Sequence, residues 1–171
     1  MAATSSPTQS TVFSAVRAFI LSVITTEVVQ GRDNLVDPVT EGIVITPLFR
    51  TRLSTNSHTY HDPVTTIGTE TTTQHVQLSI QVDCYGEHAP EWADIISTLW
   101  RDEIAATAMG GNVQPIDADD PQCLEFIDPG DVGYVVRWMV TGRVQVNPAI
   151  VTPMEFFDTV TDVVFVAADL L

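Results

Sequence analysis

Two stretches of the chain carry apolar residues at the three- and four-residue spacing of an amphipathic helix. The first predicts a helix from a Ser10 or Thr11 cap to about Ile24, and the second a helix from Pro90 to about Met109. The predicted apolar faces are Val12, Val16, Phe19 and Val23, widened by Phe13, Ile20 and Ile24, and then Trp92, Ile95, Ile96, Leu99, Trp100 and Ile104. The first face is broad enough that we expect a second surface to pack on this helix.

Alternation of apolar and polar residues predicts three long strands, at Gly42–Leu53, Val76–Cys84 and Tyr134–Val146. Pro47 cannot donate to a strand ladder, so the first of them is expected to be an edge strand or to contain a bulge. We expect its Ile43, Ile45 and Phe49 on one face and its Val44, Leu48, Arg50 and Arg52 on the other. Shorter strands are predicted at Glu27–Gly31, Asn112–Ile116 and Val160–Val166.

The remaining segments connect or extend these elements. Leu53–Thr73 is polar and rich in threonine, which predicts a long hairpin or loop that projects from the body. Asp117–Gly133 is interpreted as an acidic loop, and Pro148–Pro153 as a break in the strand pattern. Residues 1–10 are expected to be a flexible lead-in, and residues 11–171 one domain. The predicted fold class is α+β, an antiparallel sheet with both amphipathic helices on one face and the other face left open.

The amino-acid composition argues against several classes of function. The 171 residues contain no lysine, and seven arginines against 22 acidic residues give a net charge of −15. Binding of DNA depends on basic side chains that displace counterions from phosphate, so the composition argues against a nucleic-acid reader. The longest apolar run contains Arg17 and is too short to span a bilayer. Cys84 and Cys123 are too few for a disulfide scaffold, and no secretory signal opens the sequence, so we expect reduced, buried thiols.

Three small groups of residues suggest chemistry. His58 and His61 followed by Asp62 have the spacing of metal ligands, and Asp117, Asp119 and Asp120 are similar to the start of a calcium loop. Solvated loop histidines and an acidic surface loop are the favoured interpretations, because a third ligand and the closing glutamate are missing. Cys84 with His88 is a conceivable nucleophile and base, but an apolar setting keeps a thiol inert. We therefore predict no catalytic residues, no metal and no cofactor.

The outward arginines form two pairs, Arg50 with Arg52 and Arg137 with Arg143, and the spacing within each pair places its members on one face. Two interpretations remain open. The arginines form ion pairs with nearby carboxylates of the same chain, or they pair across a boundary between subunits, where arginine is favoured.

In its order of segments the chain resembles the neck or tail-terminator proteins of tailed bacteriophages. The resemblance includes the opening helix. It continues through Val28–Asn34, Ile45–Asn56 with Tyr60 after it, Asp83–Gly86, Ile96–Glu103, Pro115–Pro121, Arg137–Trp138 and Gln145–Pro148. It implies a structural virion protein of the tail and neck, assembled in the bacterial host cytoplasm, without catalytic residues. It also implies a hexameric ring that caps the tail tube and joins it to the head connector or adaptor, with a sheath as neighbour if the tail is contractile.

In such a ring, DNA passes through the channel without specific binding, and no membrane is involved. The acidic composition suits a conduit, because carboxylates repel phosphate. Asp117, Asp119 and Asp120 are the expected channel-facing residues, and Arg50, Arg52, Tyr60, Arg137 and Arg143 the expected subunit interface. Two other classes remain as alternatives. One is an acidic, monomeric binding module that mimics nucleic acid or acts as an inhibitor, and the other is an enzyme with a metal site in Asp117–Asp131.

Overall fold

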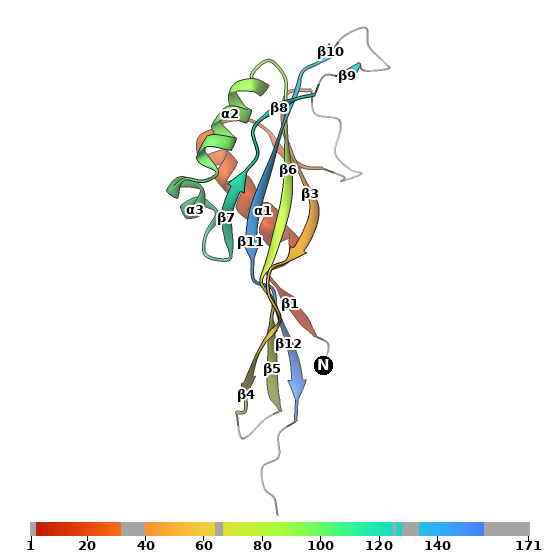
Figure 1. Cartoon of the computed structure of the whole chain (residues 1–171), viewed down its shortest axis with the longest axis vertical. Coiled ribbons are helices and arrows are strands. Elements are labelled where there is room, and N and C mark those ends of the chain that lie inside the picture. The colour runs from red at the N-terminus through yellow and green to blue at the C-terminus, as the bar shows by residue number, and fades with distance from the viewer. Residues whose placement is uncertain (1–2, 32–39, 64–66, 125, 128–133, 156–171) are drawn as a thin grey trace, which may run out of the picture.

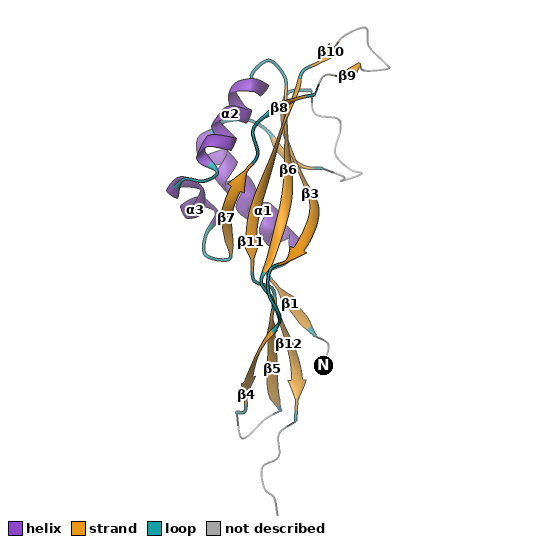
Figure 2. Ribbon diagram, in the orientation of Figure 1, coloured by secondary structure: helices purple, strands orange, loops and turns teal. Residues whose placement is uncertain are grey.

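The structure is a computed structural model that describes residues 3–31, 40–63, 67–124, 126–127 and 134–155. Figure 1 shows a body, in which helices pack on a sheet, and a narrower arm of strands that projects from one end of it. The body comprises three helices and a six-stranded sheet, and the arm is a four-stranded sheet. Helices and strands are both well represented (Figure 2), and the predicted α+β class is confirmed.

The body sheet is built around three long strands. Its order is β2 (Val28–Gln30), β3 (Gly42–Arg52), β6 (Val76–Tyr85), β11 (Arg137–Val146) and β7 (Val113–Ala118), and β8 (Gln122–Cys123) also pairs with β11. All pairings are antiparallel except that of β2 with β3, which is parallel, so the expectation of a wholly antiparallel sheet was wrong at this edge. β2 ends at Gln30 and β3 begins at Gly42, and parallel strands need a longer connection than the tight turn of a hairpin.

The three helices, α1 (Gln9–Val23), α2 (Ala89–Leu99) and α3 (Glu103–Met109), lie on one side of the body sheet (Figure 2). Between them and the sheet lies the core, in which the largest fully buried side chains include Trp100, Phe19, Ile20, Ile43 and Ile45. The rings of Phe19 and Trp100 meet edge to face at 5.7 Å between centroids, which links α1 to the end of α2. The second surface that packs on α1 therefore comes from the same chain.

Two features of the helices differ from the prediction. Thr8 rather than Ser10 or Thr11 caps α1, because its backbone is extended and its hydroxyl accepts the Thr11 N–H at 3.3 Å. The second predicted helix is divided into α2 and α3 around Trp100–Asp102. There the Trp100 indole N–H donates to the carbonyl of Arg143, and Arg101 donates to that of Ala118. These bonds tie the break to β11 and β7.

The helix break changes which side chains face the core. Ala89, Ala93, Ile96, Ala105 and Met109 are buried, whereas the predicted face members Ile95 and Ile104 are exposed. The small alanine side chains let the two short helices lie close to the sheet. The buried side of these helices therefore contains alanines, which a search for large apolar residues does not detect.

A bulge in β3 sets the direction of its side chains. The register with β6 shifts between Pro47, which pairs with Ile80, and Phe49, which pairs with Ser79. One residue more on β3 than on β6 reverses the alternation beyond this point. Phe49 was expected inward with Ile43 and Ile45, but it lies on the opposite face and is 64% exposed. The bulge that Pro47 predicted is confirmed, but its effect on the residues beyond it was missed. Arg50 and Arg52, expected on the face opposite Ile43 and Ile45, lie on the same side as these residues.

The arm continues the three central strands of the body. Its order is β1 (Thr4–Ser6), β12 (Ala149–Met154), β5 (Gly68–Thr73) and β4 (Ser57–His61), all antiparallel. Because β4 follows β3, β5 precedes β6 and β12 follows β11, the strand order β3-β6-β11 is repeated as β4-β5-β12. The predicted projecting hairpin is thus β4 and β5, and Figure 1 shows it extending from the body.

Two arm strands were not predicted. Residues 1–10 were expected to be a lead-in, yet Thr4–Ser6 forms β1 and pairs with Ala149–Val151 of β12. Pro148–Pro153 was expected to break the strand pattern, yet residues 149–154 form β12. Pro148 precedes this strand, and Pro153 lies beyond the part that β1 covers. Neither proline therefore lies where a strand is paired on both sides and a backbone N–H is needed.

The chain between β7 and β11 is more regular than an acidic loop. Asp117 belongs to β7, and the short strands β9 (Phe126–Ile127) and β10 (Tyr134–Val135) pair with each other. The predicted strand Val160–Val166 lies outside the described residues.

Candidate functional site

The arm exposes apolar side chains without burying any of its own. Every residue of β4 is exposed, and no apolar side chain of β1, β4, β5 or β12 belongs to the buried core among the described residues. Tyr60 on β4 is 55% exposed, and Ile150, Val151 and Met154 on β12 are also exposed. Small sheets need an apolar face packed on something to be stable, so the arm has the character of a surface that is completed by a partner.

Two histidines, one on the arm and one at its base, make local hydrogen bonds. Nδ1 of His58 lies 2.7 Å from Oε1 of Glu70 on the neighbouring strand and 3.4 Å from the hydroxyl of Thr72. Nδ1 of His75, at the base of the arm, lies 2.7 Å from Oδ1 of Asn147. In the described ranges no three His, Cys, Asp or Glu residues gather closely enough to hold a metal ion. His58 therefore acts as a cross-strand partner in the arm.

Arg137 closes a buried ion pair on the sheet face that the helices leave uncovered. Its terminal nitrogen lies 2.9 Å from Oδ1 of Asp83, whose side chain is 5% exposed, and its Nε lies 3.1 Å from the same oxygen. The side-chain amide of Gln81 also donates to Asp83, and the Arg137 guanidinium lies 5.8 Å from the ring centroid of Tyr85. Burial and the neighbouring Asp83 carboxylate raise the pKa of Tyr85.

Arg143, on the same face, binds two of the three expected channel residues. It lies 3.1 Å from Oδ1 of Asp117 and 2.9 Å from Oδ1 of Asp119. These hydrogen bonds raise the pKa of Arg143 above its ordinary value. Asp120 is exposed and has no hydrogen bond or ion pair with any residue that the structure describes. Of the three carboxylates, Asp120 is therefore the one whose charge is not offset by Arg143.

Arg50 and Arg52 differ from the other pair in position and in partners. They stand opposite Leu78 and Val76 in the register with β6, which places them beyond the bulge on the helix side of the sheet, where the arm begins. The Arg52 guanidinium lies 2.7 Å from the side-chain oxygen of Gln74 when that amide is oriented to accept. Within the described part of the chain, Arg50 makes no ion pair.

The five expected interface residues thus do not form one cluster. Tyr60 lies on the arm and Arg50 and Arg52 at its base, while Arg137 and Arg143 face the opposite side of the body sheet and pair within the chain. For Arg137 and Arg143 the structure supports the first interpretation of the sequence, ion pairing with nearby carboxylates. Among the described residues, neither Arg50 nor Arg52 makes an ion pair, so the charges of these two arginines are available to another molecule.

The two cysteines have different surroundings. Cys84 is fully buried, and burial, with a smaller effect of Asp83, raises its pKa to about 12, so it is a protonated thiol at neutral pH. Cys123 is exposed, which corrects the expectation that both are buried, because β8 pairs with the outer end of β11, where less of the body covers it. Both thiols are free. In the described residues, no helix is long and apolar enough to cross a membrane.

A known protein family matches the chain over nearly its whole length. A model of the phage neck terminator protein family matches residues 10–168, nearly the whole chain. The chain belongs to the phage neck terminator family. Proteins of this kind are structural components of the phage neck, so a structural role in the virion, in association with other head and tail components, follows for this neck terminator. No curated protein matches the sequence.

Sequence reasoning missed two parts of this surface. It did not place β1 and β12 in the arm of the neck terminator, and it did not foresee that Arg50 lies beside the start of α1. The signal for β12 was the apolar run Ile150-Val151 between two prolines, which is typical of a short strand bounded by turn residues. The second depends on the bulge at Leu48 and had no separate signal.

Proposed function

We propose that this neck terminator assembles into a ring, expected to be hexameric, that caps the tail tube and joins it to the head connector or adaptor. The arm carries this proposal, because it exposes Tyr60, Ile150 and Val151 and buries no apolar side chain among its described residues. An arm of this kind is stabilised when a neighbouring subunit or the tube covers it. The tail sheath is a further partner if the tail is contractile. Assembly takes place in the host cytoplasm before the protein becomes part of the virion.

The charge of the chain supports the second part of the proposal, a central channel for DNA. A net charge of −15 without a lysine repels phosphate over most of the surface, so DNA passes without binding. Asp117 and Asp119 offset Arg143, and Asp120 adds an exposed negative charge beside them. We assign this group of carboxylates to the channel wall.

The experiment is to measure the mass of the purified chain by mass photometry over a range of concentrations, alone and with purified tail tubes, and to image the same samples by negative-stain electron microscopy. Rings with a central hole, alone or on tube ends, are expected. A chain that stays monomeric and also leaves tube ends bare contradicts the proposal. That result favours the acidic, monomeric binding module.

A further inference from the structure

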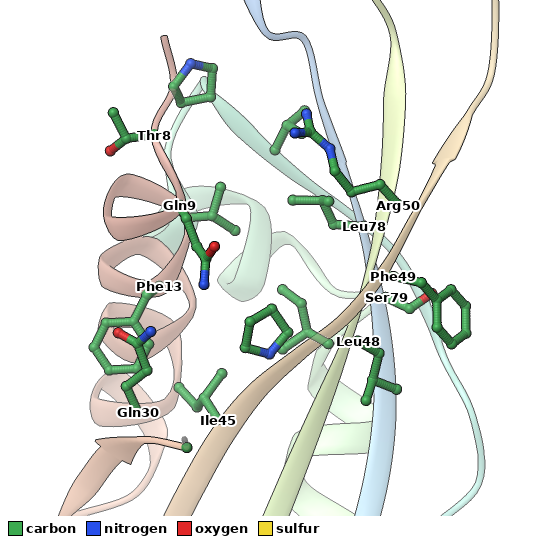
Figure 3. Close-up of a pocket in the computed structure, with 16 residues that line it drawn as sticks. Thr8, Gln9, Phe13, Gln30, Ile45, Leu48, Phe49, Arg50, Leu78 and Ser79 are labelled. Carbon is green, nitrogen blue, oxygen red and sulfur yellow. The ribbon is translucent and has the colours of Figure 1, made fainter. Parts of the chain in front are cut away.

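A groove with two adjoining parts lies where the arm joins the body. The first part, of about 420 Å³, lies between the start of α1 and strands β3 and β6. The second, of about 480 Å³, lies between the base of the arm and the end of β3. Arg50 lines both parts, so they form one continuous surface. Figure 3 shows Gln9 extending from α1 into this space and Leu78 and Arg50 on the wall across from it.

The chemistry of the groove differs from that of the rest of the molecule. Its first part is lined mainly by apolar side chains, among them Val12, Phe13, Pro47 and Leu78, and its second part contains Arg50 and Arg52. Within the described part of the chain no Asp or Glu lines either part, although the sequence contains 22 acidic residues. A ligand with apolar side chains and carboxylates, and without cations, is complementary to such a surface.

We infer that this groove binds residues 155–171 of a neighbouring copy of the chain. The sequence of this segment is EFFDTVTDVVFVAADLL, which has four acidic residues, no basic residue and apolar residues along its length. Its carboxylates would face Arg50 and Arg52, and its phenylalanines and valines would cover Leu78, Pro47 and Phe13. The inference rests on the proposed assembly of the neck terminator and names a contact that holds neighbouring subunits together.

The direction of β12 favours the groove of a different copy over that of the same chain. Ala149 pairs with Thr73 near the body, and Met154 pairs with Gly68 at the far end of the arm, so the chain leaves the arm at its tip. Met154 lies four residues beyond Ile150, which lines the second part of the groove, so the segment starts about 13 Å from the groove of its own chain and is directed away from it. An arm that reaches another subunit delivers residues 155–171 to that subunit.

Photo-cross-linking of the full-length chain tests the inference. Gln9 is replaced by p-benzoylphenylalanine, which suits an exposed helix position, and ¹⁵N-labelled and unlabelled chains are mixed during assembly. We expect cross-links from position 9 to residues 155–171, in peptide pairs with one labelled and one unlabelled partner. The same replacement at Thr98, an exposed position on α2, is the matched control and should not reach this segment. A second groove variant, at Leu78, covers the case in which the helix start does not accept the new side chain.

The electrostatic part of the inference has its own pair of variants. Arg50→Gln with Arg52→Gln lowers the net charge by two, and Thr98→Glu with Asn112→Asp lowers it equally at exposed positions away from the groove. We expect the first pair to reduce the cross-link yield about fivefold, as the loss of two exposed ion pairs predicts, and the second to leave it unchanged.

The outcomes separate this inference from the proposed function. Rings on tube ends without cross-links to residues 155–171 contradict the inference and leave the proposed function standing. Cross-links found only as same-label pairs, with no pair that joins a labelled to an unlabelled partner, also overturn it, because the groove is then filled by its own chain. An absence of rings and of tube binding contradicts the proposed function instead, and the isotope pattern of any cross-links still decides the inference.

Discussion

Gly142 lies on β11 where the indole ring of Trp100 approaches the backbone. A Cβ atom at this position would overlap the six-membered part of that ring, which is fixed by its hydrogen bond to the carbonyl of Arg143. We expect Gly142→Ala to destabilise the protein by about 3 kcal/mol, because the new Cβ atom pushes the buried ring out of its packed, hydrogen-bonded position. Urea denaturation measures the loss. Gly111→Ala is the matched control, since no atom lies within 4 Å of its added Cβ, and it should change the stability by less than about 0.5 kcal/mol. Equal effects of the two substitutions would contradict the assigned contact.

The buried pair of Asp83 and Arg137 should contribute more to stability than the exposed group around Arg143. Asp83→Ala leaves a partly buried guanidinium without its carboxylate, and we expect a loss of about 2 to 3 kcal/mol in urea denaturation. Asp117→Ala leaves Arg143 paired with Asp119 at a surface, and its cost should stay below about 1 kcal/mol. If Asp117→Ala costs as much as Asp83→Ala, burial is not what distinguishes the two pairs.

Cys84 makes the free energy of unfolding fall at high pH. Its pKa is raised from 9.0 to about 12 in the folded protein, so the unfolded chain releases the thiol proton more readily than the folded one. This contribution to stability is complete below pH 9 and is lost as the pH rises from about 9 toward 12. Alkylation of the native protein at pH 8 should therefore modify Cys123 alone, and denaturant should be needed for a second label. Peptide mapping by mass spectrometry identifies the modified residue, and rapid native labelling of Cys84 would contradict its burial.

At the scale of elements, alternation in the sequence was a reliable guide where it was uninterrupted. β6 and β11 were predicted nearly to their ends because one face of each is covered by helices and the other is not. The bulge in β3 was predicted from Pro47, but the reversal of Phe49 was not, because a pattern of period two carries no record of one extra residue. β12 was missed for a related reason, since prolines read as breaks unless the pairing partners are known.

The candidate site was predictable only in part. The threonine-rich sequence of residues 53–73 indicated a projecting hairpin, and the structure confirms it as β4 and β5. The division of the arginines was not predictable, because it depends on which carboxylates the fold brings near them. Arg137 and Arg143 meet Asp83, Asp117 and Asp119 through pairings that span more than twenty residues, whereas Arg50 is left without such a partner in the described part of the chain.

The arm is expected to be dispensable for folding and necessary for assembly. Deletion of Asn56–Gly68 removes β4 and its connection to β5, and none of the described residues in this range contributes an apolar side chain to the body core. The variant should still melt cooperatively, followed by circular dichroism, but should lose ring formation and tube binding. Tyr60→Ala is the finer variant, and we expect it to weaken tube binding about tenfold, because an exposed tyrosine on an arm is a favoured contact residue. Thr59→Ala, beside it on β4, is the control. Unfolding of the deletion variant would show that β4 belongs to the core.

At the scale of the whole molecule, the deciding question is where the negative charge lies in the assembly. An acidic protein fails to bind DNA whatever its shape, so a weak affinity of the free chain does not identify a channel. A charge reversal at one position separates the channel wall from other surfaces. Asp120 is the suitable position, because it is exposed and its replacement breaks no bond with Arg143.

Asp120→Lys should make a channel wall that retains DNA while ring assembly stays intact. In the proposed ring each subunit contributes one such lysine, and the ring would then present a circle of cations to the phosphates that pass through it. We expect slower or stalled DNA ejection from particles that carry this variant, with the delay reduced at higher salt because counterions screen the attraction. Asp94→Lys, an equal charge change at an exposed position on α2, is the matched control. Ejection kinetics are followed by the fluorescence of a dye that binds released DNA. Unchanged kinetics for Asp120→Lys, in particles whose rings are complete by electron microscopy, would place this carboxylate on another surface of the ring.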